Sequence, residues 1–328
     1  MSCHTNAGPV VVTGAFGFIG RRLLLRLRQG APDRSIIALG HEHAPENLPD
    51  SVSAIVLDLE DEGRTASFLA EIAPDMIIHL AGQASVVGAG ISPWPAWKTN
   101  VGATLSLAEA FLRVSPAGTF IFASSAEVYG RSFEGGGALT EDALLQPANA
   151  YARGKVAAEY GLRDLWAGSL GKLVIARIFN HIGAGQSERF VASSFAAQLA
   201  RMEVGISEPL IRVGNLHVER DFGHIDDLTE ALALLAERVE ALESGAVFNI
   251  CSGRPRSILG VLEGLISLSR VRPEVRVEPD LIRPGELQRV LGSHEALRAA
   301  TGWRPRRRIE DALRDVLADW RVRIAAAS

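Results

Sequence analysis

Cysteine is scarce in this chain of 328 residues. Cys3 and Cys251 are its only cysteines, which excludes a disulfide framework, and neither has the spacing of a metal-binding motif. The histidines are scattered, and their one close pair, His41 and His43, falls in a predicted loop. We therefore expect no metal site, and a protein that works in a reducing compartment, the cytoplasm.

Long hydrophobic runs and an excess of charge of one sign are also missing. No uncharged apolar stretch reaches the ~18 residues that a membrane-spanning helix needs, and the polar start of the chain does not predict a signal peptide. The formal net charge is -4, and the basic run at residues 304–308 only precedes a predicted helix. These features predict neither nucleic acid nor a membrane as a partner.

Apolar, strand-forming sequence is abundant, since 47% of the residues are hydrophobic. Through the first half, short apolar runs alternate with stretches of helical periodicity. Apolar strands between helices are typical of a parallel sheet covered on both faces, so we predict an α/β fold with a doubly wound, Rossmann-type sheet. Buried strands are predicted at 9–13, 35–39, 53–57, 76–80, 119–124 and 173–178, and helices at 18–29, 62–72, 96–114 and 151–166.

From about residue 180 the alternation loosens. We predict a dinucleotide-binding Rossmann domain over residues 1–178 and a smaller, mixed α/β substrate-binding lobe over 179–328. Parts of 215–250 are expected to return to the first domain. The second half has predicted helices at 191–202, 226–242 and 257–269 and predicted strands at 210–213, 247–250 and 274–277.

A glycine-punctuated turn links the first predicted strand to the first predicted helix. Gly14 lets the strand turn tightly, Gly17 lets the backbone approach a pyrophosphate, and Gly20 lets helix and strand pack closely. Unpaired N–H groups and the positive end of the helix dipole then hold the phosphates. A glycine turn alone can serve packing, but its place in a βαβ run predicts a dinucleotide site with contacts from Gly14, Phe16, Gly17, Phe18 and Ile19.

The residues at the end of the second predicted strand indicate whether the dinucleotide is NAD or NADP. A carboxylate there would favour NAD, but the chain has Gly40 and His41, and Arg21, Arg22 or Arg34 are available to pair with a 2′-phosphate. We expect NADP or NAD, with NADP slightly favoured. The ends of later strands supply further predicted cofactor contacts: Asp58, Leu59, Leu80, Ala81 and Gly82.

Tyr151 and Lys155 lie four residues apart on a predicted helix and therefore share a face. The ammonium is expected to lower the pKa of the phenol from its usual ~10, so that Tyr151 exchanges a proton with a carbonyl oxygen as hydride is transferred. Lys155 would also bond the nicotinamide ribose, and Ser125 would donate a hydrogen bond to the reacting oxygen. A surface pair is the alternative, but lysine occurs only at Lys98, Lys155 and Lys172, so a chance match at this spacing is rare.

These motifs resemble the extended short-chain dehydrogenase/reductases that modify nucleotide sugars, the NAD-dependent epimerase/dehydratase family. The likeness runs from Val10 to about Arg321. Within that family, the second half is similar to GDP-4-keto-6-deoxy-mannose reductases. The matching pieces are Ser124-Ser125-Ala126-Glu127-Val128-Tyr129-Gly130, Arg177-Ile178-Phe179-Asn180-His181, Gly185-Gln186, Arg189-Phe190-Val191, Arg212-Val213-Gly214-Asn215-Leu216, Arg220-Asp221-Phe222, Arg283-Pro284-Gly285-Glu286 and Thr301-Gly302-Trp303.

The resemblance implies a GDP-sugar substrate that is held by its diphosphate. Guanidinium forks match phosphate oxygens, and the family pattern assigns Arg220 and Arg283 to that clamp, with Arg212 on the nucleotide side. Family likeness also implies a homodimer through the helices at 96–114 and 151–166. Further substrate contacts are implied at Ser85, Glu127, Asn180, Phe190, Val191 and Glu286.

One departure from the family pattern separates reduction from dehydration. The related 4,6-dehydratases carry an acidic or hydroxyl residue after the catalytic hydroxyl and then a glutamate, whereas here Ser125 is followed by Ala126 and then Glu127. Alanine has no proton to transfer, so we expect NAD(P)H-dependent reduction of a GDP-4-keto-6-deoxyhexose to a GDP-6-deoxyhexose of the GDP-rhamnose type. The alternatives are a UDP- or dTDP-hexose 4-epimerase or ketoreductase, and a non-catalytic nucleotide-sensing subunit.

Overall fold

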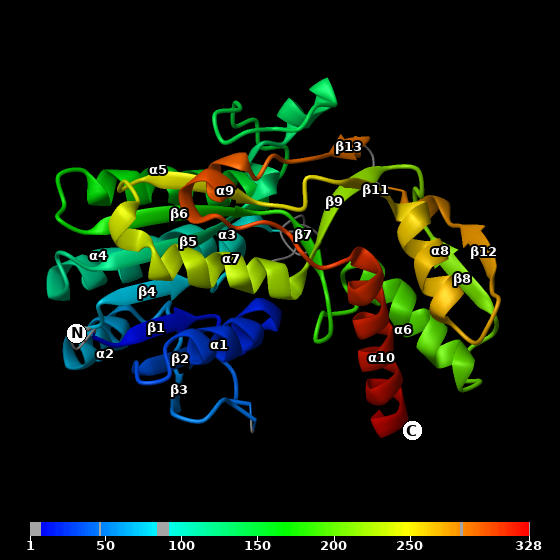
Figure 1. Cartoon of the computed structure of the whole chain (residues 1–328), viewed down its shortest axis with the longest axis horizontal. Helices are drawn as coiled ribbons and strands as arrows, with labels where there is room; N and C mark the ends of the chain where they lie inside the picture. Colours follow the sequence, from blue (N-terminus) through cyan, green and yellow to red (C-terminus); the bar gives the residue numbers. More distant parts are fainter. Residues whose placement is uncertain (1–7, 46, 84–91, 283–284, 328) are drawn as a thin grey trace.

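The computed structural model describes residues 8–45, 47–83, 92–282 and 285–327. A large parallel sheet with helices on both faces makes up one part of the molecule, and a smaller lobe of short strands and helices makes up the other (Figure 1). The carboxyl ends of the sheet strands face the smaller lobe. Among the residues that the structure describes, none of the helices combines the length and the hydrophobicity of a membrane-spanning segment.

Seven strands form the main sheet, in the order β10-β6-β5-β4-β1-β2-β3. All neighbouring pairs are parallel, and β1 lies between β2 and β4. This order is that of a doubly wound fold and confirms the predicted Rossmann-type sheet. The strands are β1 (Val10–Thr13), β2 (Ile36–Gly40), β3 (Val52–Val56), β4 (Met76–His79), β5 (Thr119–Ser125), β6 (Lys172–Ile178) and β10 (Ala246–Ile250).

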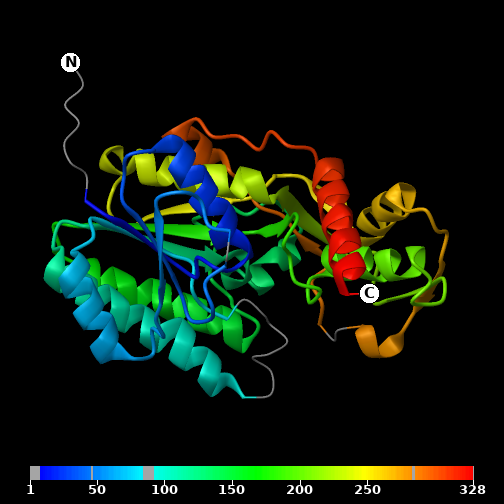
Figure 2. The ribbon, with the colours of Figure 1, turned by 90° about the horizontal axis from the view of Figure 1, so that it is seen from below.

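The side chains of β1 show how both faces of the sheet are covered. Val10 and Val12 point into a core that they share with Leu23, whereas Val11 points into a second core with Phe111. Figure 2 shows α1 and α7 on one side of the sheet and α2, α4 and α5 on the other. These helices are α1 (Phe18–Gly30), α2 (Glu62–Ile72), α4 (Thr104–Val114), α5 (Ala150–Trp166) and α7 (Ile225–Glu237).

Two elements of this part differ from the sequence prediction. The strand predicted as buried over 53–57 is β3, the edge of the sheet, where Ser53, Ala54 and Val56 are exposed because only β2 pairs with it. The helix predicted over 96–114 is divided into α3 (Pro93–Trp97), a π-helical turn (Lys98–Ala103) and α4. Side-chain periodicity does not register such a widened turn, because it changes the winding of only a few residues.

The second lobe is built around β9, which pairs in parallel with β7 and β13 and antiparallel with β11. Its helices pack around a core that includes Phe195, Leu262 and Leu317. The lobe consists of β7 (Asn180–Ile182), β9 (Glu219–His224), β11 (Pro255–Ser257), β13 (Arg289–Val290), α6 (Val191–Glu203), α8 (Ile258–Leu268), α10 (Ile309–Ala327) and the pair β8 (Leu210–Val213) and β12 (Glu274–Val277).

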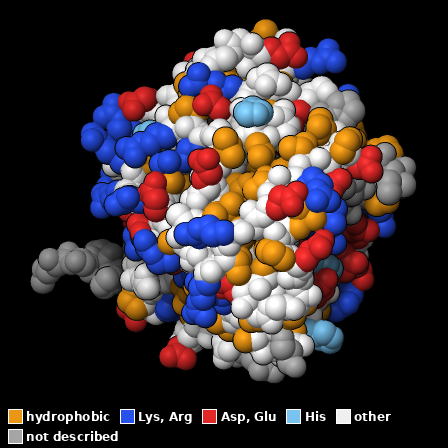
Figure 3. Space-filling model, turned by 90° about the vertical axis from the view of Figure 1, so that its right-hand side faces the viewer, with side chains coloured by type: hydrophobic (Ala, Val, Ile, Leu, Met, Phe, Trp, Pro, Cys, Tyr) orange, Lys and Arg blue, Asp and Glu red, His pale blue; other side chains and the backbone are white. Residues whose placement is uncertain are grey.

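Hydrophobic side chains gather among charged ones on the face of the molecule that Figure 3 shows, over the end of the second lobe. Val275 and Val277 of β12 are exposed. Short elements complete the fold: α9 (Glu295–Thr301) and the 3-10 turns Ala126–Val128, Arg131–Gly135, Val239–Ala241 and Pro279–Leu281.

The chain returns from the second lobe to the main sheet within residues 215–250. Helix α7 packs beside α1, and β10 extends the sheet next to β6. A division of the chain at residue 178 stays a prediction.

Two buried histidines lie near the carboxyl edge of the main sheet. His79 ends β4, with Nδ1 2.7 Å from Thr13 Oγ1 and Nε2 2.9 Å from Thr104 Oγ1. Burial, with a smaller effect of the Lys155 charge, lowers the pKa of His79 to about 3. Burial likewise lowers the pKa of His181 in β7 to about 4. Both rings are therefore neutral in the folded protein at neutral pH.

We expect acid to destabilise the protein in the window that these histidines define. The unfolded chain protonates them below pH ~6.5 and the folded chain only near pH 3 to 4. The unfolded state therefore binds more protons between these limits, so stability is full above pH ~6.5 and falls as pH falls. At pH 5 each histidine should lower the free energy of unfolding by about 2 kcal/mol relative to pH 7.

Urea denaturation at pH 7 and pH 5 measures this effect. His79→Gln should lose less stability on acidification than the parent chain. His41→Gln, at an exposed position, should lose as much as the parent. An equal acid loss in His79→Gln and the parent would contradict the assignment.

Candidate active site

The glycine turn lies at the carboxyl end of β1, against the end of β4. Gly14 has φ +64°, and a Cβ there would lie 2.8 Å from the backbone nitrogen of Ala81. A Cβ at Gly20 would collide with the Gly14 carbonyl oxygen, so both positions require glycine. Gly17 caps α1 without a side-chain hydrogen bond, which leaves the first-turn N–H groups for an anion. These features fit the pyrophosphate of a dinucleotide.

The residues after β4 lie beside this turn. Thr13 Oγ1 accepts a hydrogen bond from the Ala81 N–H (3.2 Å). Gly82 has φ +147°, and a Cβ there would lie 2.7 Å from Asn100 Oδ1 and 3.6 Å from Lys155 Nζ. Leu80, Ala81 and Gly82 are thus adjacent to both the glycine turn and the lysine, and their cofactor contacts stay a prediction.

The residues after β3, Asp58 and Leu59, also belong to the predicted cofactor contacts. Asp58 is exposed, and its Oδ1 accepts a hydrogen bond from the Glu60 N–H (2.9 Å), whereas Leu59 is buried in the core of this face. Asp58 therefore closes a turn in this structure. Its predicted contact with adenine remains a prediction.

Helix α5 carries Tyr151 and Lys155 against the carboxyl end of β5. Asn149 Oδ1 accepts a hydrogen bond from the Ala152 N–H (2.8 Å), which caps the helix just before the tyrosine. Tyr151 is 9% exposed and Lys155 5% exposed. The Lys155 Nζ donates to the Ala123 carbonyl oxygen (2.8 Å).

Ser125, the last residue of β5, meets the phenol at this point. Its side chain forms a hydrogen bond with Tyr151, and its hydroxyl oxygen accepts another from the Glu127 N–H (3.2 Å). The structure thus brings Tyr151, Lys155 and Ser125 together, close to the glycine turn, from elements that are far apart in sequence. Their catalytic roles stay a prediction, taken up below.

The protonation of this site differs from the sequence expectation. Burial raises the pKa of Tyr151 to about 12, and the Glu127 charge adds to this against the Ser125 hydrogen bond. Burial also lowers the pKa of Lys155 to about 8. The expected lowering of the phenol pKa by Lys155 is therefore absent here, because loss of water on burial has the largest effect on this group. Tyr151 holds its proton at neutral pH and is ready to act as an acid.

Glu127 lies close to the phenol but is held by another residue. Its Oε2 accepts a hydrogen bond from Asn149 Nδ2 (3.1 Å), so the helix cap and the glutamate support each other. Ala126 between Ser125 and Glu127 is buried. The position that an elimination would need for an acid thus holds only a methyl group.

The three arginines considered for a 2′-phosphate occupy different places. Arg34 precedes β2, at the amino end of the sheet, where its Nε donates to the Gly8 carbonyl oxygen, so it lies at the wrong end for the cofactor. Arg22 lies 3.9 Å from the Asp226 carboxylate. Arg21 is exposed and donates from Nε to the Phe16 carbonyl oxygen (2.7 Å) within the glycine turn. Only Arg21 remains as a candidate.

The predicted substrate residues fall into separate groups. Arg220 on β9 lies 3.2 Å from Glu286 and donates to the Leu287 carbonyl oxygen (2.8 Å), so two members of the predicted set are in contact. Arg212 on β8 instead pairs with Glu278 (2.6 Å). Ser85 and Arg283 lie outside the described residues.

The remaining predicted substrate residues lie at the start of the second lobe. Asn180 is exposed at the first position of β7, and Phe190 is exposed just before α6. Val191, the first residue of α6, is half-buried against the core of the lobe. Their contacts with a substrate stay a prediction.

A buried polar network that lies beyond Lys155, between α5 and β6, was not predicted. It includes Glu159, Arg177, Tyr129 and Asn249. A signal for it was present, because Glu159 follows Lys155 by one helical turn on the same face. Among the described residues, no group of three or more His, Cys, Asp or Glu side chains could hold a metal ion.

Sequence comparison agrees with this geometry. The model of the NAD dependent epimerase/dehydratase family matches residues 10–251. GDP-6-deoxy-D-mannose reductase from Pseudomonas aeruginosa is 35% identical over 318 residues, which cover 95% of this chain and 97% of that protein.

Solved structures of similar proteins have the same fold. The structure of RMD from Pseudomonas aeruginosa, complexed with NADPH, superposes with a TM-score of 0.82 at 33% identity and covers 97% of this chain and 100% of that chain. UDP-glucose 4-epimerase from Thermus thermophilus, in complex with NAD, superposes with a TM-score of 0.84 at 27% identity over 95% and 99% of the two chains. The predicted family and NAD(P) as its class of cofactor are confirmed. The chain belongs to the NAD dependent epimerase/dehydratase family, within the extended short-chain dehydrogenases/reductases.

Proposed function

We propose that this protein reduces the 4-keto group of a GDP-4-keto-6-deoxyhexose and releases a GDP-6-deoxyhexose. The observation that carries the proposal is the contact of a protonated, buried Tyr151 with Ser125, next to a turn shaped for a dinucleotide. The similarity to GDP-6-deoxy-D-mannose reductase over nearly the whole chain supports the choice of substrate.

The residues of the chain divide the work of reduction. When bound, the reduced nicotinamide supplies the hydride. Tyr151 donates its proton to the ketone oxygen, and Ser125 donates a hydrogen bond to the same oxygen, so the charge that develops there is neutralised. Lys155 favours the phenolate that Tyr151 becomes after transfer, since an ammonium nearby stabilises negative charge. Ala126 supplies no proton, which leaves the sugar hydroxyls in place.

The second lobe would hold the nucleotide. Arg220 and Glu286 already lie together in this lobe, and a diphosphate matches the fork of the arginine. We assign Arg283 to the same clamp and Arg212 to the nucleotide side. Binding of the nucleotide in the second lobe keeps the reacting carbon of the sugar near the catalytic residues, because the binding energy of the nucleotide is used to orient the sugar.

Turnover with defined sugars tests the proposed substrate. NADPH oxidation should be seen with GDP-4-keto-6-deoxymannose and should be much slower with the UDP- and dTDP-linked ketosugars. Interconversion of UDP-glucose and UDP-galactose with tightly retained NAD, and no net oxidation of NADPH, would instead identify a 4-epimerase. Binding of GDP-sugars without any turnover would identify a sensing subunit.

Tyr151→Phe removes the proton donor and keeps the ring. We expect kcat for the ketosugar to fall at least ~100-fold, while the Kd for NADPH changes little, because the lost group acts in the transition state. Tyr160→Phe is the matched control, since Tyr160 lies on the same helix and is 61% exposed. Its kcat should equal that of the parent, and an unchanged kcat in Tyr151→Phe would refute the acid role.

Arg21→Ala tests the preference for NADP. Loss of one arginine–phosphate pair should raise the Kd for NADPH by about tenfold to 100-fold and leave the Kd for NADH unchanged, because only NADPH carries the 2′-phosphate. Fluorescence titration of the two cofactors measures both constants. Arg22→Ala is the control. A selective loss of NADPH binding in Arg22→Ala but not in Arg21→Ala would show that the wrong arginine was assigned.

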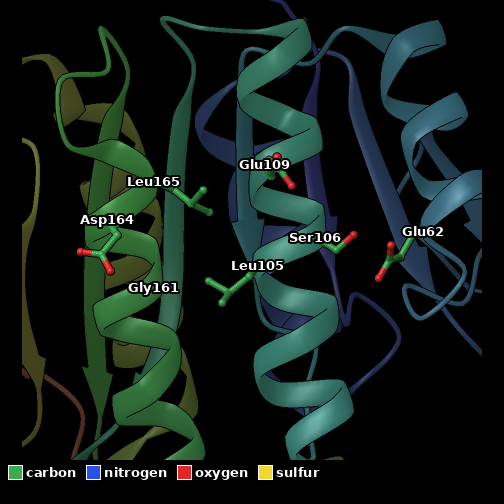
Figure 4. Close-up of a pocket in the computed structure, with 7 residues that line it drawn as sticks. All are labelled: Glu62, Leu105, Ser106, Glu109, Gly161, Asp164 and Leu165. Carbon is green, nitrogen blue, oxygen red and sulfur yellow. The ribbon is translucent and has the colours of Figure 1, made fainter.

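We further propose a homodimer formed through α4 and α5. A hollow of about 490 Å³ lies between these helices, away from the catalytic residues, and Figure 4 shows Leu105 and Leu165 directed into it. Gly161 lets the helices approach, since a Cβ there would lie 2.8 Å from Leu105 side-chain carbons. Glu62, Glu109 and Asp164 also line the hollow, and the exposed Tyr160 lies one turn before Asp164 on α5.

Light scattering measures the assembly directly. The parent should have about twice the chain mass of 35.1 kDa, and Leu105→Glu/Tyr160→Glu should have the mass of one chain. Charges in the interface would have to be desolvated, which separates the subunits. A parent of single-chain mass would refute the dimer.

A further inference from the structure

A buried ion pair lies one helical turn beyond Lys155. Glu159 on α5 and Arg177 on β6 are 2% and 4% exposed. Arg177 contacts both carboxylate oxygens, with Nε 3.1 Å from Oε1 and Nη2 2.8 Å from Oε2. Burying such a pair costs desolvation energy and by itself is weak evidence for stability. The groups that the pair contacts, and not the pair alone, account for its presence.

The pair fastens the catalytic helix to the catalytic strand. The Ser124 hydroxyl donates to Glu159 Oε1, and the preceding carbonyl, that of Ala123, accepts from Lys155. Lys155 and Glu159 thus bind two successive residues of β5 from one face of α5. The next residue along the strand is Ser125, so the register of these bonds determines where its hydroxyl meets Tyr151.

Arg177 is itself held from the far side. Its Nη1 donates to the Tyr129 hydroxyl (3.0 Å) and to the Glu141 carbonyl oxygen (3.0 Å). Tyr129 in turn donates to Asn249 Oδ1 on β10 (2.7 Å). Ser124 and Arg177 thus hold the Glu159 carboxylate from two sides, and Tyr129 and Glu141 in turn hold Arg177.

The charges around Lys155 give Glu159 a second effect. Among the described residues, Glu159 from α5 and His79 from β4 interact electrostatically with the ammonium. Tyr151 lies one turn before Lys155 on α5, and Arg177 from β6 lies behind Glu159. Burial lowers the pKa of Lys155, and the Glu159 carboxylate opposes this shift. His79 is neutral, so Glu159 is the negative charge in this group.

We propose that Glu159 is a positioning residue for the catalytic site, which keeps Lys155 charged and holds β5 in register with α5, and that Arg177 fixes Glu159 in place. The expected effect of Glu159 on turnover rests on the proposed function, whereas its expected effect on the charge of Lys155 does not. The role of Glu159 and the proposed function can therefore be refuted separately.

The scarcity of lysine allows a direct measurement. Protein labelled with 13C at lysine Cε has three lysine signals, from Lys98, Lys155 and Lys172, and Lys155→Met assigns the buried one. Glu159→Gln should lower the titration midpoint of Lys155 by about one pH unit or more, because the favourable charge is lost and Arg177 remains. The double variant Glu159→Gln/Arg177→Gln should bring the midpoint back towards the parent value. If Glu159→Gln does not fold, Glu159→Asp should show a smaller downward shift.

Turnover supplies the second readout. The alkaline limb of the kcat profile for reduction of GDP-4-keto-6-deoxymannose by NADPH should move to lower pH in Glu159→Gln, with about a fivefold loss of kcat at pH 8 and KM unchanged. Glu203→Gln is the control, because it breaks another two-oxygen pair of glutamate with arginine, that of Glu203 with the partly exposed Arg321 (2.7 and 2.8 Å) in the second lobe. It should lower stability only, without moving the Lys155 midpoint.

The outcomes test the role of Glu159 and the proposed function separately. An unchanged Lys155 midpoint in the folded Glu159 variant, or an equal shift in Glu203→Gln, would overturn the role of Glu159. A parent enzyme that does not reduce the ketosugar, while the midpoint of Lys155 shifts as described, would overturn the proposed function alone.

Discussion

The contact between helix α5 and the carboxyl end of β5 is the interaction on which the site depends. Lys155 binds the Ala123 carbonyl oxygen, and Tyr151 meets Ser125 a short way along the same strand. Neither contact survives a shift of the helix by one residue, because the side chains would then leave the face that they share. The parallel sheet makes this register stable, since β5 is paired on both sides and buried on both faces.

Burial accounts for the protonation of the site. A phenol without water keeps its proton, and an ammonium without water loses its proton more easily, which moves the two pKa values to about 12 and about 8. Burial thereby reverses the ordinary order of these two groups, because the pKa of a free lysine lies slightly above that of a free tyrosine. At neutral pH the site therefore holds a neutral acid beside a largely charged amine, which suits proton donation to a ketone better than removal of a proton from an alcohol.

The sequence predicted the parts that local geometry determines. The spacing of Gly14, Gly17 and Gly20 and the four-residue interval between Tyr151 and Lys155 each define a local shape, and strand and helix order followed from hydrophobic periodicity. It did not predict that β3 is an exposed edge, since that depends on how strands are ordered in space. The amino-end position of Arg34 follows from its place just before the second strand, a signal that was not used in the prediction. The Glu159–Arg177 pair and the raised pKa of Tyr151 also depend on burial, which a local pattern does not measure.

A deuterium label on the cofactor follows the hydride from the nicotinamide to the sugar. With NADPH deuterated at the transferable position of its nicotinamide, we expect one deuterium at ring carbon four of the GDP-6-deoxyhexose for each NADPH oxidised. Mass spectrometry and NMR of the recovered nucleotide sugar locate and count the label. A sugar that is epimerised without deuterium, or NADPH that is not consumed while the ketosugar is bound, would contradict the account.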